Sequence, residues 1–184
     1  LPMQQLLPLA LHVAGALAYL HGQGLVHLDV KPDNIVMGVP PRLIDLSIAR
    51  DAERAARSRG PLGTDAYMAP EQCGAGDEHG VMSPASDVWG LGVTLRHALS
   101  GERPYPRADG ARGSDDPLVR FPQLEEEPRP LPDFVAAELA ELLDETQRRD
   151  PDARPSAPEL ADRLEPLVAD LPRRLSMSRR GPQL

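Results

Sequence analysis

The sequence has 184 residues, enough for one domain with a hydrophobic core, and 41% of them are hydrophobic while only 3% are aromatic. A formal net charge of -8 argues against nucleic acid as the main partner, and the single cysteine, Cys73, excludes an internal disulfide. No apolar run reaches the roughly 18 residues of a membrane-spanning helix. We therefore expect a cytoplasmic protein with no membrane segment in this chain, although a longer parent protein could be anchored to a membrane.

The first elements are a helix and two short strands. Leucine and valine recur at helical spacing over 8–22, which predicts a mostly buried helix. Two short apolar runs at 25–26 and 35–37 then flank a polar loop over 27–34. Their β-branched residues favour extended structure.

The strands are followed by a turn and a long loop. Two prolines at 40–41 indicate a turn before a third apolar run at 42–44. This order predicts a small β-hairpin with the polar loop at its mouth. Residues 46–68 are polar, Arg-rich and aperiodic, which is typical of a long surface loop.

Three further helices are expected. The stretch 84–99 starts with a proline and is apolar on almost every side, so it predicts a central helix. Residues 101–132 are rich in Pro, Gly and charge, which indicates loops with one short helix near 115–120. An apolar stripe over 133–147 follows an Asp cap, and a Ser cap with a capping box starts the helix over 156–169. The fold class is therefore mostly α, of the α+β family, with a helical body around a central helix.

The loop at 27–34 carries the chemistry that points to a function. It reads His-Leu-Asp-Val-Lys-Pro-Asp-Asn, with a carboxylate at Asp29, an ammonium at Lys31 and an amide at Asn34. Phosphoryl transfer needs these three groups. A carboxylate orients the acceptor hydroxyl and takes its proton, a cation neutralises the moving charge, and an oxygen ligand holds Mg²⁺.

This loop resembles the catalytic loop of protein kinases, apart from Leu28, where that family has Arg. Further segments resemble kinase motifs in the family's order, and they lie at 45–47 (Asp-Leu-Ser), 63–71, 86–92 and 150–155. The chain is thus similar to the C-terminal lobe of a serine/threonine protein kinase of the bacterial, eukaryotic-like type. The resemblance implies a kinase lobe over 1–170 and leaves a flexible basic tail over 171–184.

The resemblance also implies a role for each matched residue. Asp29 would be the general base, Lys31 would contact the γ-phosphate of ATP, and Asn34 and Asp45 would hold Mg²⁺. Thr64 would tie the substrate-binding segment to Asp29 and Lys31. ATP and Mg²⁺ would be the cofactors, and the partners would be protein substrates with Ser or Thr hydroxyls.

Other matched residues would support the site. Glu71 and Arg154 would form a buried ion pair, and Asp87 would hold the catalytic loop through backbone N–H groups. His27 and Leu46 would stack on each other below the nucleotide.

Three departures from the family pattern shape the functional prediction. The sequence has no G-x-G-x-x-G, and its only lysine is Lys31, so we expect the N-terminal lobe to be missing and the chain alone to be inactive. Leu28 cannot pair with a phosphate, and 46–62 contains only Ser47 and Ser58 as acceptors, which argues against control by phosphorylation of this loop. Ser47 also stands where glycine is usual.

The alternative is a pseudokinase or kinase-derived scaffold that binds protein partners without catalysis. Leu28 and Ser47 lean toward this reading. The joint retention of four groups favours the enzyme, because a scaffold does not need them together; they are Asp29, Lys31, Asn34 and Asp45.

Overall fold

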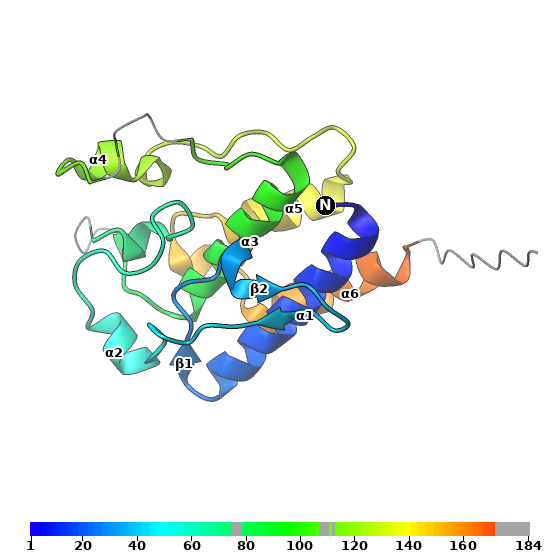
Figure 1. Ribbon diagram of the computed structural model, residues 1–184, viewed down its shortest axis with the longest axis horizontal. Coiled ribbons are helices and arrows are strands. Elements are labelled where there is room, and N and C mark those ends of the chain that lie inside the picture. Colours follow the sequence, from blue (N-terminus) through cyan, green and yellow to red (C-terminus); the bar gives the residue numbers. More distant parts are fainter. Residues whose placement is uncertain (75–78, 107–110, 112, 172–184) are drawn as a thin grey trace, which may run out of the picture.

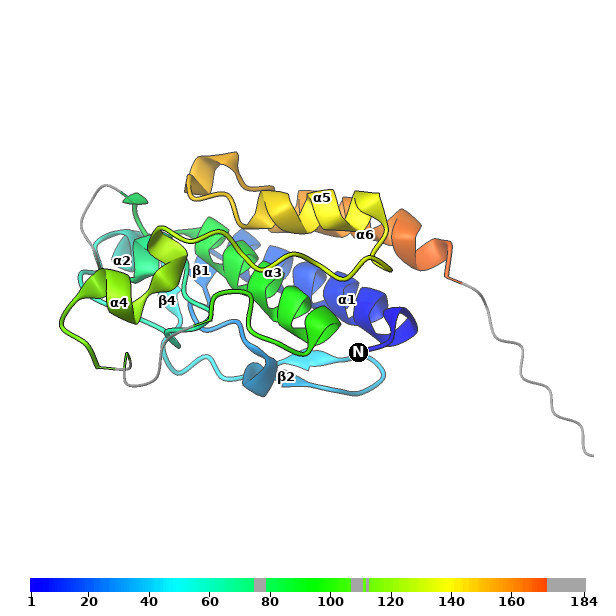
Figure 2. The same cartoon turned by 90° about the horizontal axis from the view of Figure 1, so that it is seen from above.

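The computed structural model describes residues 1–74, 79–106, 111 and 113–171. Its helical body is shown in Figure 1, and the view in Figure 2 separates its layers. Helices α1 (Met3–Gly22) and α3 (Pro84–Ser100) form a middle layer, with α5 (Ala137–Thr146) and α6 (Ala157–Ala169) on one side. A small hairpin lies on the other side. The fold is mostly helical with a minor β element, as the sequence predicts.

Helix α3 is the centre of the body, as expected for 84–99. Ser83 caps it by accepting a hydrogen bond from the backbone N–H of Ala85, and Pro84 occupies its first turn, where the missing N–H costs nothing. The helix ends at Gly101, which has the left-handed φ of 77° that a helix C-terminus favours. Twelve of its residues are buried, because α1, α5 and α6 all pack against it.

Helix α1 begins five residues before the expected 8–22 and continues through Pro8. Burial of Leu6 and Leu7 in the core favours this additional turn and a half and offsets the hydrogen bond that Pro8 removes. The helix has 20 residues, and an 18-residue window in it has a mean hydropathy of 1.3, so it meets the criteria for a membrane-spanning helix by length and composition only. One face of α1 packs in the core of this fold, and core helices commonly satisfy the same criteria.

The sequence predicts the start of α6 correctly but not that of α5. Helix α6 begins after Ser156 with the expected capping box, in which the Ser156 N–H donates to Glu159 Oε2 at 2.8 Å. Helix α5 begins four residues later than expected, after Ala136, so Asp133 is not its cap. The backbone N–H of Val135 instead donates to the Pro132 carbonyl at 3.0 Å, and this turn occupies the expected first helical residues.

The expected hairpin is present. Strand β2 (Ile35–Val36) pairs antiparallel with β3 (Arg42–Leu43), with Ile35 opposite Leu43. A second pair joins β1 (Leu25–Val26) to β4 (Arg50–Asp51). The sequence did not indicate this second pair, because β4 lies inside the segment that reads as a loop.

The expectation of an unstructured loop over 46–68 is wrong in part. Besides β4, it contains the short helix α2 (Ala52–Ala56), which Asp51 caps by accepting from the Arg54 N–H at 2.9 Å. Ala55 is fully buried against Val26 and Leu28, so tertiary packing orders a helix too short to be stable alone.

The remaining chain consists of short elements. The expected short helix is α4 (Pro117–Arg120). Within the described residues, four single 3₁₀ turns each start with proline, whose fixed φ suits a first helical position. They are η1 (Pro32–Asn34), η2 (Pro70–Gln72), η4 (Pro122–Leu124) and η5 (Pro151–Ala153). The tail expected at 171–184 lies outside the described residues except for Leu171.

Candidate active site

The loop at 27–34 is fixed from below by one carboxylate of the central helix. Asp87 accepts hydrogen bonds from the backbone N–H groups of His27 at 2.8 Å and Leu28 at 2.7 Å. Its Oδ2 also lies 2.9 Å from Nε2 of His21 on α1. This confirms the expectation that Asp87 holds the loop. The two anchored N–H groups come directly before the Leu28 Cα, where a φ of 67°, rare for a residue with a side chain, turns the chain toward Asp29.

Asp29, Lys31 and Thr64 form a closed triangle of hydrogen bonds. Lys31 Nζ donates to Asp29 Oδ2 and to Thr64 Oγ1, each at 2.7 Å, and Thr64 Oγ1 donates to Asp29 Oδ1 at 2.7 Å. Asn34 Nδ2 completes the cluster by donating to the Asp29 carbonyl at 2.8 Å and to Asp29 Oδ2 at 3.1 Å. Four of the five site residues expected from the sequence therefore make direct contact.

The surroundings of Asp29 keep its carboxyl group ionised. Burial raises the pKa of Asp29, but the hydrogen bonds from Lys31 and Thr64 and the positive charge of Lys31 lower it by more. The pKa therefore lies below its usual range. At neutral pH, Asp29 presents a negative charge that can accept a proton from a hydroxyl group.

Thr64 reaches Asp29 because Gly63 allows two backbones to come close. Gly63 has a φ of 130°, and a Cβ atom on it would lie 2.8 Å from the Leu28 carbonyl oxygen. Only glycine accommodates both conditions without strain. The Gln72 amide, Nε2, bridges the same two segments by donating to the carbonyls of Leu28 and Leu62, both at 2.8 Å.

Gln72 is a residue that the sequence reasoning missed. It is buried and follows Glu71 directly, so its only sequence signal was an amide at the end of a recognised motif.

Asp45, the fifth expected residue, is brought next to Asn34 by the chain between them. The Ile44 N–H donates to the Asn34 carbonyl at 2.9 Å, and the Ile44 carbonyl lies 3.1 Å from His27 Nε2. Asp45 has a φ of 68°, and with Leu28 it is one of two non-glycine residues with positive φ among the described residues. Both are at this site, where backbone strain commonly accompanies function.

The Asp45 carboxylate is exposed, and hydrogen bonds from the Ser47 side chain and N–H lower its pKa. The Ser47 N–H lies 3.1 Å from Asp45 Oδ1. In the described part of the chain, no residue donates to Asn34 Oδ1, so this amide oxygen is available as a ligand. An amide oxygen and a carboxylate, here on residues linked through the backbone bond of Ile44 to Asn34, are donors that suit Mg²⁺, which typically takes one or two protein ligands and completes its shell with phosphate and water oxygens. The described residues contain no group of three or more His, Cys, Asp or Glu side chains that could hold a metal by themselves.

The expected ion pair between Glu71 and Arg154 is present and fully buried. Arg154 donates to Glu71 Oε1 at 2.7 Å and to Oε2 at 2.9 Å, and neither side chain is exposed. The Ser86 hydroxyl adds a third bond to Glu71 at 2.7 Å. The Arg154 guanidinium also lies 4.9 Å from the centre of the Trp89 ring. The pair therefore joins the segment after Thr64 to α3 and to the turn before α6.

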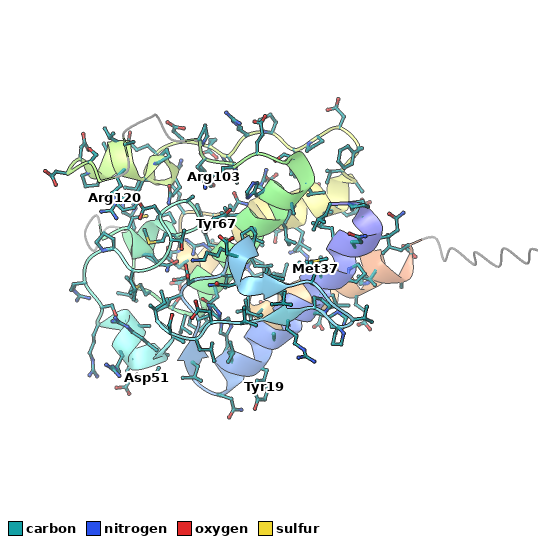
Figure 3. The ribbon with its side chains drawn as sticks, viewed as in Figure 1. Tyr19, Met37, Asp51, Tyr67, Arg103 and Arg120 are labelled. Atoms are coloured by element: carbon teal, nitrogen blue, oxygen red, sulfur yellow. The ribbon has the colours of Figure 1, made fainter. Side chains whose placement is uncertain are left out.

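The expected stacking of His27 on Leu46 stays a prediction. His27 is completely buried, whereas Leu46 is 52% exposed. Leu46 belongs to a set of exposed apolar side chains on and beside the hairpin, which are Val36, Met37, Val39, Ile44 and Leu46. Figure 3 labels Met37 on this hairpin.

Leu28 has a structural role in apolar packing that the sequence did not indicate. It is only 2% exposed and packs with Val26, Ala55 and Met82. Ala55 comes from α2, so this apolar cluster anchors the segment over 46–62 directly to the loop that carries Asp29.

The arrangement has counterparts among known proteins. The family model described as the protein kinase domain matches residues 1–164. A probable serine/threonine-protein kinase, PkwA of Thermomonospora curvata, is 39% identical over 164 residues, which cover 85% of this chain and 20% of that protein. The serine/threonine-protein kinase PknA of Mycobacterium tuberculosis is 38% identical over 143 residues, covering 76% of this chain and 31% of the relative. The serine/threonine-protein kinase AfsK of Streptomyces coelicolor is 37% identical over 169 residues, which cover 90% of this chain and 20% of that protein. The chain thus spans 20% to 31% of the length of these relatives.

Proposed function

Because the chain belongs to the protein kinase family, with bacterial serine/threonine kinases among its relatives, we propose that it forms the lobe that carries the phosphoryl-transfer loop of such an enzyme. The reaction is transfer of the γ-phosphoryl group of ATP to Ser or Thr hydroxyls of protein substrates. The observation that carries the proposal is the triangle of Asp29, Lys31 and Thr64 with Asn34 and Asp45 next to it. The C-terminal lobe comprises residues 1–170 in this proposal.

The residues of the triangle take separate parts in the transfer. Asp29 has a lowered pKa and is ionised, so it orients the acceptor hydroxyl and takes its proton. The Lys31 ammonium neutralises negative charge on the phosphoryl group as it moves. Thr64 holds the substrate-binding segment against both residues and therefore has a positioning role.

Asn34 and Asp45 are the residues that would hold Mg²⁺. Their oxygen atoms fit this cation, because Asn34 Oδ1 accepts no hydrogen bond from the described residues and the Asp45 carboxylate is exposed. When bound, Mg²⁺ neutralises charge on the phosphate oxygens of ATP. The hydrogen bond from the Ile44 N–H to the Asn34 carbonyl keeps the two ligands together.

The chain requires a second lobe for this activity. It contains neither a G-x-G-x-x-G nor a lysine other than Lys31, so it offers no partner of the usual type for the remaining ATP phosphates. The exposed apolar residues on and beside the hairpin, among them Met37 at 52% and Val39 at 105% exposure, supply a surface for such a lobe to cover. We expect the 184-residue chain by itself to bind Mg-ATP weakly and to transfer no phosphate, which calorimetry and a radiolabel assay measure.

The test of the proposed function is a chimera in which the N-terminal lobe of one of the curated relatives precedes Leu1. Asp29→Ala and Asp45→Ala should each lower phosphorylation of a Ser/Thr peptide by at least about 10²-fold, the lower range for a positioned general base. Asp133→Ala, an exposed carboxylate on a turn, is the matched control and should leave the rate unchanged. Near-normal turnover by either site variant would reject the role given to that residue. Nucleotide binding without any transfer would favour the scaffold alternative.

The chimera should also be active without phosphate on the segment over 46–62. Leu28 orders this segment by apolar packing with Ala55, which needs no phosphate. The structure does place one cation near an acceptor, since Arg50 donates to Ser58 Oγ at 2.6 Å. Ser58→Ala and phosphatase treatment should therefore each leave most of the activity. A collapse of the rate that follows loss of phosphate from Ser58 would show that Arg50 supplies the pairing that Leu28 lacks.

A further inference from the structure

A groove of about 780 Å³ lies on the side of the molecule away from the hairpin. It is formed by the first turns of α1, by α5 and by the C-terminal half of α6, and Figure 2 shows the end of α6 beside the start of α1. Its lining is largely apolar and includes Met3, Leu7, Leu139, Leu142, Leu167 and Leu171. The site proposed for catalysis contributes no residue to this groove.

Four carboxylates surround the apolar floor. Glu138 and Glu141 come from α5, Asp162 from α6 and Asp170 from the residue after α6, and all four are exposed. None of them makes an ion pair with another residue of the described chain. The one cation in the lining, Arg163, is already held by Glu145 Oε1 at 3.0 Å. Arg163 also interacts electrostatically with Glu141, so the groove combines an apolar floor with an excess of negative charge, which fits an occupant that is both basic and apolar.

A segment that is both basic and apolar follows Leu171, the last residue in the chain that lines the groove. Residues 172–184 read Pro-Arg-Arg-Leu-Ser-Met-Ser-Arg-Arg-Gly-Pro-Gln-Leu, with two pairs of arginines on either side of Leu175 and Met177. The segment holds four arginines and no acidic side chain, so its side chains carry a charge equal and opposite to that of the four carboxylates.

We propose that this groove is the docking site of residues 172–184, with the arginines paired to the four carboxylates and Leu175 and Met177 on the leucine floor. The sequence by itself predicts a flexible tail here, but the groove provides a partner surface that the sequence could not reveal.

The geometry of the attachment permits this docking. Leu171, the residue that precedes the segment, lines the groove itself, so the segment begins at the site. Thirteen extended residues reach at most about 43–47 Å, whereas the ten residues of α5 are only about 15 Å long. The segment can therefore turn back along α5 and α6. Attachment at Leu171 also gives it a high effective concentration at the groove, which free peptides lack.

Docking would join three helices, of which α1 leads to the catalytic loop. Met3 and Leu7 belong to α1, whose other end passes through β1 into the loop of Asp29. A docked segment would hold the start of α1 against α5 and α6.

Paramagnetic relaxation in the full 184-residue chain tests the proposal. A nitroxide is attached to Ser178→Cys in a Cys73→Ser background, which leaves one thiol, and ¹⁵N signals are compared with the label oxidised and reduced. We expect loss of signal intensity at Leu139, Leu142 and Leu167 and none at Val36 on the hairpin. Raising the salt from about 0.01 M to about 1 M shortens the Debye length from about 30 Å to about 3 Å and should restore much of the intensity.

Two charge-reversal variants provide the controls. Glu138→Lys with Glu141→Lys and Asp162→Lys should abolish the loss of intensity. Glu125→Lys with Glu126→Lys and Glu165→Lys makes the same change in net charge outside the groove and should preserve it.

Three outcomes would overturn the proposal. The first is no loss of intensity at the groove, and the second is a loss that both charge-reversal variants preserve equally. The third is a loss that also occurs when spin-labelled chain is mixed with ¹⁵N chain lacking the label, which would assign the groove to a second copy.

Discussion

Replacing Arg154 with methionine removes the cation of the buried ion pair while preserving most of the side-chain volume. Glu71 would keep only the hydrogen bond from Ser86 and would remain a fully buried charge. Breaking a buried pair in this way costs about 3–5 kcal/mol. The change also removes the stacking on Trp89 and hydrogen bonds to three carbonyl groups, those of Ala85, Arg148 and Arg149.

The expected loss is a large part of the stability of a typical domain, which is about 5–15 kcal/mol. Urea unfolding measures it, followed by circular dichroism and by the fluorescence of Trp89, the only tryptophan of the chain. The urea midpoint should fall and the slope of the free energy with denaturant should stay the same. Trp89 is in contact with Arg154, so its emission in the folded state should also change.

Two further variants show whether the loss of stability in Arg154→Met comes from the unpaired buried charge of Glu71. Arg57→Met removes an exposed i,i+4 pair with Glu53 and should cost less than about 1 kcal/mol. Combining Glu71→Met with Arg154→Met should recover part of the loss, because no uncompensated charge then remains buried. If Arg154→Met cost no more than Arg57→Met, the buried pair would not stabilise this fold as argued.

Two other perturbations test the geometry of the site. The lowered pKa of Asp29 means that its ionised form stabilises the folded state above its unfolded pKa, and that this contribution disappears as the pH falls through the folded value. Between about pH 5 and about pH 2, the free energy of unfolding should therefore fall more steeply in the wild type than in Asp29→Asn, and parallel pH profiles would contradict this. Gly63→Ala should destabilise the chain by about 1–3 kcal/mol, because its φ is 130° and the new Cβ would meet the Leu28 carbonyl. Gly15→Ala in helix α1, where a Cβ meets nothing within 4 Å, is the control and should stabilise the chain by about 1 kcal/mol. A neutral Gly63→Ala would show that the two segments can separate without cost.

The sequence by itself determined the elements that have a strong local pattern. The central helix over 84–99 is apolar on most sides and starts with a proline, and the start of α6 has the capping box of Ser156. Both signals involve residues within one or two turns of each other, so they need no tertiary partner. The residues of the site were also visible, because the chemistry of Asp29, Lys31 and Asn34 lies within six consecutive residues.

Only the tertiary structure decided the elements whose partners are distant in the sequence. Strand β4 has two residues and pairs with β1 across 23 intervening residues, so no local pattern could indicate it. Helix α2 has five residues and depends on the burial of Ala55 against Val26 and Leu28. An isolated helix of that length does not repay its nucleation cost, and the contact that orders it does not exist until the chain has folded.

The same reason explains Leu28 and Gln72. In the sequence, Leu28 is notable only because it stands where the family has an arginine, and Gln72 is one amide among several. In the folded chain, Leu28 anchors the segment that follows Asp45, and Gln72 binds the Leu28 carbonyl and brings Thr64 to Asp29. Residue types at fixed spacing define the chemistry of this loop, whereas contacts between segments some 25–45 residues apart in the chain set its geometry.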